Sequence, residues 1–336
     1  MKLELGKKRN SSAAATAVGM MAIVLWSLMM GLVRLVSESF SATLGPALIY
    51  TCGAILLLIF RRPKPLSQAP RKYLLIGGGL FVFYETSIAL SVGLAATSAQ
   101  SVEISLVNYL WPTLMVLLAA GVSHRKHAVA YAIPGAIVAT AGVIVSVGGN
   151  SGLDWQVAAH NVASNPLPYL LALAGAFAWS VYAVITPSMA KGYDGTSLFF
   201  PMVTCTLWVI HIVTSVVGGG ASGVGSTVGA SGSVSAGGTG ITAALVDLGN
   251  WIAAQPVSAW LTVVFAAVAI AGGYACWGYG ILHGSMETMA VASYATPVLS
   301  VGASAVLLHL SLSLPFWFGA LLVAAGSVLN WLLQKR

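Results

Sequence analysis

The segment GAIVATAG at residues 135–142 recurs as GALLVAAG at residues 319–326, with glycine at both ends of each copy. Upstream of the first copy stands NYLWP at residues 108–112, and upstream of the second stands SYATP at residues 293–297. Matches that return in the same order are the mark of an internal repeat. The chain therefore uses one structural unit twice, and this repeat decides the fold.

The composition indicates what kind of unit is repeated. Hydrophobic residues make up 58% of the 336 residues and charged residues 7%, where a soluble domain carries about 25% charged residues. That balance excludes a water-soluble enzyme and predicts a multi-pass membrane protein, because each crossing needs about 20 apolar residues. Ten such runs are expected, at residues 13–34, 43–60, 73–93, 99–122, 128–148, 168–189, 198–217, 259–282, 287–308 and 316–333.

The two copies divide these spans equally. Further matched pairs are Trp26 with Trp179 and Tyr84 with Tyr274. We therefore expect an all-α integral membrane protein built from two five-helix repeats, at residues 1–150 and 151–336. Because five is odd, the second repeat enters the membrane inverted, an arrangement typical of transporters that work by alternating access. A duplicated helical scaffold without transport is the alternative.

Loop charges predict the orientation, because Lys and Arg favour the cytoplasmic side. With the N-terminus inside, every basic residue except Arg34 falls in a cytoplasmic segment, so both termini are expected in the cytoplasm. The basic residues of segment 61–72 then contact membrane lipids rather than nucleic acid, which is not an expected partner. Residues 218–246, rich in Gly and Ser, are expected to form a flexible outer loop.

Aromatic residues occur in the middle of several predicted spans, although Trp and Tyr usually mark the membrane interfaces. A cavity lined by such rings suits a flat, largely apolar ligand. Pro112 and Pro297 leave the carbonyls of Asn108 and Ser293 without helical partners. These two sites are either hinges or ligand contacts, or else packed kinks. The predicted substrate-binding residues are Trp26, Tyr84, Asn108, Tyr109, Trp111, Trp179, Tyr182, Tyr274, Trp277, Ser293 and Tyr294. Ordinary helix packing is the alternative for each.

Charged and titratable residues inside or beside the spans are candidates for gating or proton coupling. They are Arg34, Glu85, Glu103, His283 and Glu287. Arg34 is predicted to pair with Glu103 or Glu85 when the outer mouth closes. The alternative is a local pair with Glu38, one helical turn away.

No catalytic residue, metal site or cofactor is expected. The sequence lacks the HExxH, CxxC and GxxxxGK patterns, so a membrane-embedded metalloenzyme and ATP-driven transport within this chain are not favoured. We expect a monomer. The small-residue face with Gly135, Ala139 and Gly142 is either internal packing or, as the alternative, a dimer contact.

These features resemble the drug/metabolite transporter superfamily in its ten-helix EamA form, over essentially the whole chain. Each half carries a proline in its fourth helix and glycines seven residues apart in its fifth. Several runs resemble the aromatic amino-acid exporters within that superfamily. They are AIVLWS at 22–27, VNYLWP at 107–112, GILHG at 280–284, ASY at 292–294 and TPVLS at 296–300. The long Gly/Ser segment departs from the short connection expected there.

The resemblance implies a bacterial inner-membrane exporter of phenylalanine, tyrosine and tryptophan. It further implies a cavity between the halves, lined by aromatics that match Trp26, Tyr84, Tyr109, Trp111 and Trp179. An exporter of other metabolites or of lipophilic cationic drugs, with the same fold, is the alternative. Whether transport is proton-driven antiport or passive uniport is left open.

Overall fold

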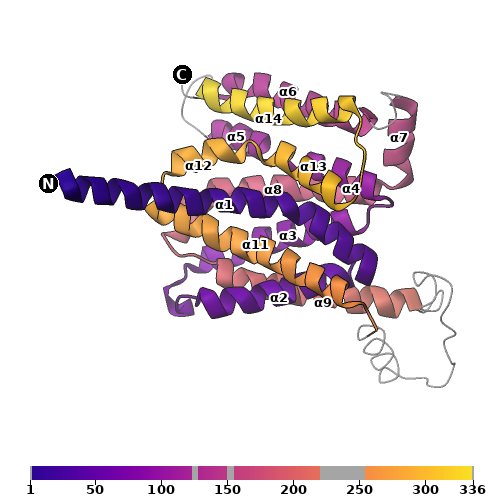
Figure 1. Ribbon diagram of the computed structural model, residues 1–336, viewed down its shortest axis with the longest axis horizontal. Helices are drawn as coiled ribbons and strands as arrows, with labels where there is room; N and C mark the ends of the chain where they lie inside the picture. The colour runs from indigo at the N-terminus through magenta and orange to yellow at the C-terminus, as the bar shows by residue number, and fades with distance from the viewer. Residues whose placement is uncertain (1, 123–127, 150–154, 220–253, 335–336) are drawn as a thin grey trace.

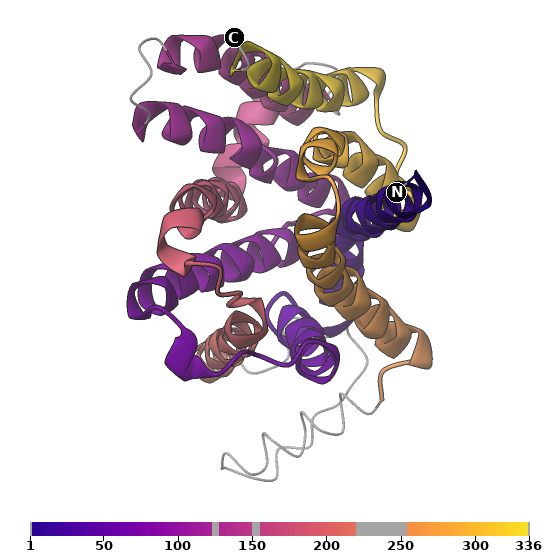
Figure 2. The same cartoon turned by 90° about the vertical axis from the view of Figure 1, so that its left-hand side faces the viewer.

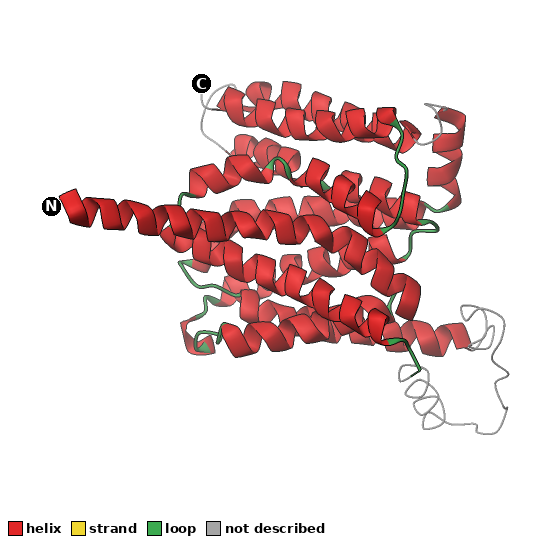
Figure 3. Cartoon of the chain, in the orientation of Figure 1, coloured by secondary structure: helices red, strands yellow, loops and turns green. Residues whose placement is uncertain are grey.

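The computed structural model describes residues 2–122, 128–149, 155–219 and 254–334, and every regular element in these ranges is a helix (Figure 3). The predicted outer loop, residues 218–246, lies almost wholly outside the described residues. Helical structure is the physical consequence of the apolar runs, because a bilayer offers the backbone no other hydrogen-bonding partner. The all-α prediction is therefore confirmed for the described chain.

The helices follow one another with short connections. In chain order they are α1 (Lys2–Phe40), α2 (Leu44–Phe60), η1 (Leu66–Gln68), η2 (Tyr73–Gly77), α3 (Gly78–Gly93), α4 (Ser98–Asn108), α5 (Trp111–Val122), α6 (Ala128–Gly149), α7 (Trp155–Ser164), α8 (Pro166–Ala190), α9 (Thr196–Gly219), α11 (Val257–His283), α12 (Met286–Ser293), α13 (Thr296–Leu307) and α14 (Leu314–Gln334). The π-helical turn η2 leads directly into α3.

Eight helical segments of the described chain are long and apolar enough to cross a membrane, counting α4 and α5 together. Two shorter apolar helices, α2 and α13, add to them. Each of the ten predicted runs overlaps one of these helices. Two features differ from the prediction: α1 continues to Phe40, and the short helix α7 lies between the fifth and sixth runs. Polar residues such as Ser37 and Glu38 end the apolar run but not the helix, so hydropathy alone predicted the end of this helix too early.

The fourth and ninth runs are broken helices rather than kinked ones. α4 ends at Asn108 and α5 begins at Trp111, so Pro112 is the second residue of a new helix. In the same way, Pro297 stands in the first turn of α13. Proline is well tolerated in the first turn, where a backbone N–H would have no helical partner anyway. The two prolines therefore mark helix starts in the interior of the bundle.

The small-residue face of α6 packs inside the chain, against α14. A Cβ atom added at Gly142 would lie 2.6 Å from the Gly319 carbonyl oxygen, and one at Gly319 would lie 2.5 Å from the Gly142 carbonyl oxygen. Gly135 and Gly326 approach each other with the same reciprocity, at 2.5 and 2.6 Å. The glycines thus allow two backbones to touch, which resolves the alternative left open by the sequence in favour of internal packing.

Most helices run along one direction, with α1 beginning and α14 ending at the left of Figure 1. The short helix α7 lies at the opposite end. Figure 2 looks onto the left-hand end and shows α6 and α14 together at one side of the bundle. The central helices α1, α3, α8 and α11 pack in pairs, α1 on α11 and α3 on α8.

Candidate functional site

A cluster of aromatic rings occupies the middle of the bundle, and Trp179 of α8 lies at its centre. Its ring centre is 4.7 Å from that of Tyr84 and 5.2 Å from that of Tyr182. Trp111 meets it edge-on at 6.3 Å and Tyr274 at 6.4 Å. These five residues come from α3, α5, α8 and α11, so the fold brings together rings that are distant in sequence.

A second part of the ring cluster centres on Trp26 of α1. The Trp26 ring lies 5.2 Å from Tyr274 and 5.4 Å from Trp277, both on α11. α11 can approach this closely because residue 273 is glycine: a Cβ there would lie 2.5 Å from the Trp26 indole nitrogen. Tyr274 contacts both Trp26 and Trp179 and so links the two parts of the cluster.

The carboxylate of Glu85 is buried next to these rings, with 1% of the residue exposed. It accepts hydrogen bonds from the hydroxyls of Tyr50 on α2 and Tyr274 on α11. A buried carboxylate is costly unless it is hydrogen-bonded, and two phenol donors meet that demand. Glu85 therefore ties three helices together at the edge of the ring cluster.

Asn108 brings a polar group to the ring cluster. The residue is 1% exposed, and neither polar atom of its carboxamide has a hydrogen bond of normal geometry, although the Tyr84 hydroxyl lies beside it. Ser300 and Thr113, early in α13 and α5, also carry buried hydroxyls without a hydrogen bond of normal geometry. Such groups are uncommon in folded proteins and call for an explanation.

The remaining predicted substrate residues lie at the helix breaks. Tyr109 directly follows α4, is 4% exposed, and has its hydroxyl beside Ser300. Ser293 ends α12, and Tyr294 is buried between α12 and α13. The structure thus gathers Trp26, Tyr84, Asn108, Trp111, Trp179, Tyr182, Tyr274 and Trp277 in one cluster. It places Tyr109 at the first helix break and Ser293 and Tyr294 at the second.

The candidate gating residues are spread over the bundle. Arg34 forms an ion pair of 2.7 Å with Glu38 and donates to the Ala95 carbonyl at 2.6 Å, which is the local alternative weighed from the sequence. Glu103 accepts a hydrogen bond of 2.8 Å from the Tyr169 hydroxyl. The pairing of Arg34 with Glu103 in another conformation stays a prediction.

The two remaining candidates, His283 and Glu287, lie near the end of α11. His283 is exposed in its last turn, stacked on Tyr279 with ring centres 4.6 Å apart. Glu287 lies in the first turn of α12, and its side chain is outside the described residues. Neither observation assigns them a role in gating.

Sequence reasoning missed several residues of the site. Tyr50 and Phe81 were not singled out, yet Tyr50 holds Glu85 and the Phe81 ring lies 5.5 Å from Tyr274. Tyr50 carries the sole phenol of α2, and Phe81 precedes Glu85 by one helical turn, which are the signals that were available. The ion pair of 2.7 Å between Arg61 and Asp194 had no sequence signal, because its partners lie in distant connections.

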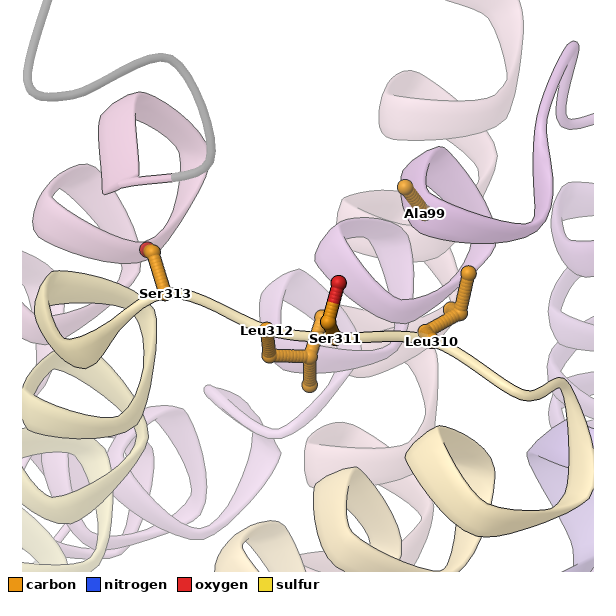
Figure 4. A pocket seen from close by; sticks show the side chains of 5 residues that line it. All are labelled: Ala99, Leu310, Ser311, Leu312 and Ser313. Carbon is orange, nitrogen blue, oxygen red and sulfur yellow. The ribbon is translucent and has the colours of Figure 1, made fainter.

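A depression of about 450 Å³ lies elsewhere, where the connection between α13 and α14 passes the start of α4 (Figure 4). It is lined by Ala99 and residues 310–313, which offer two serine hydroxyls and apolar side chains. It shares no lining residue with the ring cluster. We therefore treat it as a surface feature separate from the candidate site.

Comparisons with known proteins place this architecture in a family. No family model matches the chain. The aromatic amino acid exporter YddG of Escherichia coli (strain K12) is 38% identical over 322 residues, covering 96% of this chain and 98% of its own length. YddG of Salmonella typhimurium is 37% identical over 326 residues, covering 97% and 99%, and YddG of Ancylobacter novellus is 27% identical over 346 residues.

A solved structure, titled only as the crystal structure of a protein, covers 96% of this chain and 99% of its own with a TM-score of 0.59. At 23% identity that likeness shows a shared fold alone. The sequence relatives go further, because they match nearly the whole chain at well above 30% identity. This multi-pass membrane protein therefore belongs to the YddG family of aromatic amino acid exporters.

Proposed function

We propose that this protein exports phenylalanine, tyrosine and tryptophan across the bacterial inner membrane; its relatives are named aromatic amino acid exporters. The observation that carries the proposal is the ring cluster around Trp179, which offers faces on which an aromatic side chain can stack. Offset or edge-on ring pairs contribute about 0.5–1.5 kcal/mol each beyond the area they bury. The predicted substrate-binding residues, from Trp26 to Tyr294, supply these contacts in the proposal.

Alternating access between two inverted halves, residues 1–150 and 151–336, is the proposed mechanism, with ten spans in which α4 with α5 and α12 with α13 each count as one. Reciprocal contacts support it. Trp26 corresponds to Trp179 in the repeat, and Tyr84 to Tyr274. The contact of Trp26 with Tyr274, at 5.2 Å, has its counterpart in that of Trp179 with Tyr84, at 4.7 Å. Reciprocity of this kind is expected from two-fold symmetry.

The proposed orientation puts both termini in the cytoplasm. α1 begins and α14 ends at one end of the bundle, and the 61–64 segment lies at the turn between α8 and α9, where Tyr193 donates to the Lys64 carbonyl at 2.9 Å. The basic residues of these segments then face the cytoplasm, as the positive-inside rule requires. Arg34 lies towards the opposite end, beside Ala95.

A second candidate function, export of lipophilic cations, is favoured by Glu85 alone. A buried carboxylate beside aromatic rings can attract a cation through charge and through the ring faces. Its two oxygens are already engaged by Tyr50 and Tyr274, so a cation would have to share them. Export of aromatic amino acids is therefore better supported than export of lipophilic cations.

The ion pair of Arg61 with Asp194 is proposed as a closing contact at the cytoplasmic end, because it joins the two halves. Arg61 follows α2, Asp194 precedes α9, and the Arg61 guanidinium also reaches the Tyr274 carbonyl at 3.4 Å. A partly exposed pair contributes at most about 1 kcal/mol, or about fivefold in an equilibrium. Arg61→Asp is thus expected to change the phenylalanine uptake rate by up to about fivefold, by favouring the open cytoplasmic end.

Charge exchange distinguishes a specific pair from a general effect of charge. Uptake by the double variant Arg61→Asp, Asp194→Arg is expected to return towards the native rate, whereas Arg62→Asp, which alters an exposed neighbour, leaves the rate unchanged. Uptake rates in proteoliposomes provide the measurement. A double variant no better than either single variant means that the pair does not close this end.

The main proposal is tested by uptake of labelled phenylalanine into proteoliposomes. We expect saturable uptake that unlabelled tryptophan and tyrosine inhibit and leucine does not. A monomer suffices for the proposed mechanism, since the α6 and α14 faces that might have joined two copies pack on each other.

A further inference from the structure

The carboxamide of Asn108 lacks the partners that a buried amide requires. The residue is 1% exposed, and both its oxygen and its nitrogen lie without a hydrogen bond of normal geometry. It is the last residue of α4, and α5 begins three residues later at Trp111. A group that is buried, polar and unsatisfied next to a proposed substrate site is suited to meet the polar part of the substrate.

The surroundings of Asn108 favour an anionic group. The first turn of α5 presents the positive end of a helix dipole at the break, and Thr113 in that turn has a buried hydroxyl without a partner. The carboxamide nitrogen and the hydroxyl are both hydrogen-bond donors. The buried carboxyl group of Glu85 is hydrogen-bonded by other neighbours, the hydroxyls of Tyr50 and Tyr274.

The aromatic rings around Trp179 lie close to Asn108. The hydroxyl of Tyr84 lies beside the carboxamide, and the Tyr84 ring packs on Trp179 at 4.7 Å. Trp111, three residues after Asn108, meets Trp179 edge-on at 6.3 Å. A ligand whose head group is held at Asn108 would therefore place an aromatic side chain against these rings.

We propose that Asn108, at the start of the α4–α5 break, binds the α-carboxylate of the transported amino acid, with Thr113 as a second donor. This rests on the proposed function and adds the feature by which the site distinguishes an amino acid from an aromatic amine. Asn108 belongs to the first half of the chain, where it corresponds to Ser293 of the second. Trp179, which stacks with the side chain, belongs to the second half, and the substrate thus bridges the two halves.

The test compares three ligands that differ only in their head groups: phenylalanine, 3-phenylpropionate, which lacks the ammonium, and phenethylamine, which lacks the carboxylate. Dissociation constants are measured by calorimetry on detergent-purified native protein, Asn108→Ala and Asn330→Ala. Asn330 is the matched control, because its carboxamide is equally buried and unpartnered but faces Gly135 at the α6–α14 contact.

Asn108→Ala is expected to weaken the binding of phenylalanine and of 3-phenylpropionate by about tenfold, the usual effect of losing a hydrogen bond to a charged group. The dissociation constant of phenethylamine should change by less than about twofold in Asn108→Ala. Asn330→Ala should leave the dissociation constants of all three ligands near their native values. The comparison among ligands within one variant does not depend on how much protein is folded. If Asn108→Ala weakens the binding of all three ligands equally, or weakens none of them, the assignment of Asn108 is overturned. If the native protein neither binds nor transports phenylalanine, the proposed function fails with it.

Discussion

Replacing Trp179 by alanine is expected to lower phenylalanine uptake by about fivefold to 150-fold. Trp179 stacks with Tyr182 at 5.2 Å and packs on Tyr84 at 4.7 Å, so it both supplies a ring face and holds two other rings in place. Loss of two ring contacts at about 0.5–1.5 kcal/mol each gives this range. The measurement is the initial rate of labelled phenylalanine uptake in proteoliposomes at equal protein content.

Trp260→Ala provides the matched control for that prediction. Trp260 lies in the first turn of α11 and packs on Phe40 at 4.9 Å, at the other end of the helix from Trp277. It is expected to change uptake by less than about twofold, while Trp179→Phe should retain part of the activity. Equal losses in Trp179→Ala and Trp260→Ala would mean that aromatic residues support the fold in general and that Trp179 has no special part in transport.

Replacing Gly142 by leucine is expected to destabilise the protein by about 3 kcal/mol or more. The added side chain would collide with the backbone of α14. A Cβ at this position lies 2.6 Å from the Gly319 carbonyl oxygen and 2.7 Å from the Val323 nitrogen, and these backbone atoms cannot rotate away. The leucine would therefore force α6 and α14 apart. Thermal unfolding of the detergent-purified protein, followed by its loss from the folded monomer peak, measures the effect.

Gly121→Leu is the control for this helix contact. Gly121 lies near the end of α5 with no atom within 4 Å of an added Cβ, so the same substitution should change stability by no more than about 0.5 kcal/mol. Gly319→Leu should behave like Gly142→Leu, because the contact is reciprocal. A Gly142→Leu protein that keeps its native thermal stability but changes its oligomeric state would show that this face joins two copies instead.

Much of this fold is readable from sequence because the membrane enforces it. A run such as 128–148 has one structural solution in a bilayer, a helix, and α6 at Ala128–Gly149 agrees with it. α7 was missed because its Trp155–Ser164 segment is too short and too polar to register as a span. The helix breaks at Asn108 and Ser293 were predicted only as hinges or packed kinks, since a proline predicts a disturbance but does not say whether the helix bends or restarts.

Most of the aromatic residues of the candidate site were predicted from the sequence, whereas contacts between side chains of different helices were not. Trp26, Tyr84, Trp179 and Tyr274 were expected because they are aromatic residues in the middle of predicted spans, and the structure brings them together. Tyr50 was not expected, because its role depends on Glu85 approaching from another helix, and pairing across helices leaves no periodic signal in either. The same holds for Arg61 and Asp194, which meet only when two connections fold over the same end.

Uptake of labelled phenylalanine into proteoliposomes of purified protein is the decisive measurement of whether this protein transports aromatic amino acids. Tryptophan, tyrosine, leucine and tetraphenylphosphonium serve as unlabelled competitors, with and without an imposed pH gradient. We expect saturable uptake that tryptophan and tyrosine reduce and leucine leaves unchanged. The comparison with and without a pH gradient then separates proton-coupled from passive transport. Uptake of the lipophilic cation without any phenylalanine uptake, from protein shown to be folded, would keep the fold and contradict the assignment of aromatic amino acids as substrates.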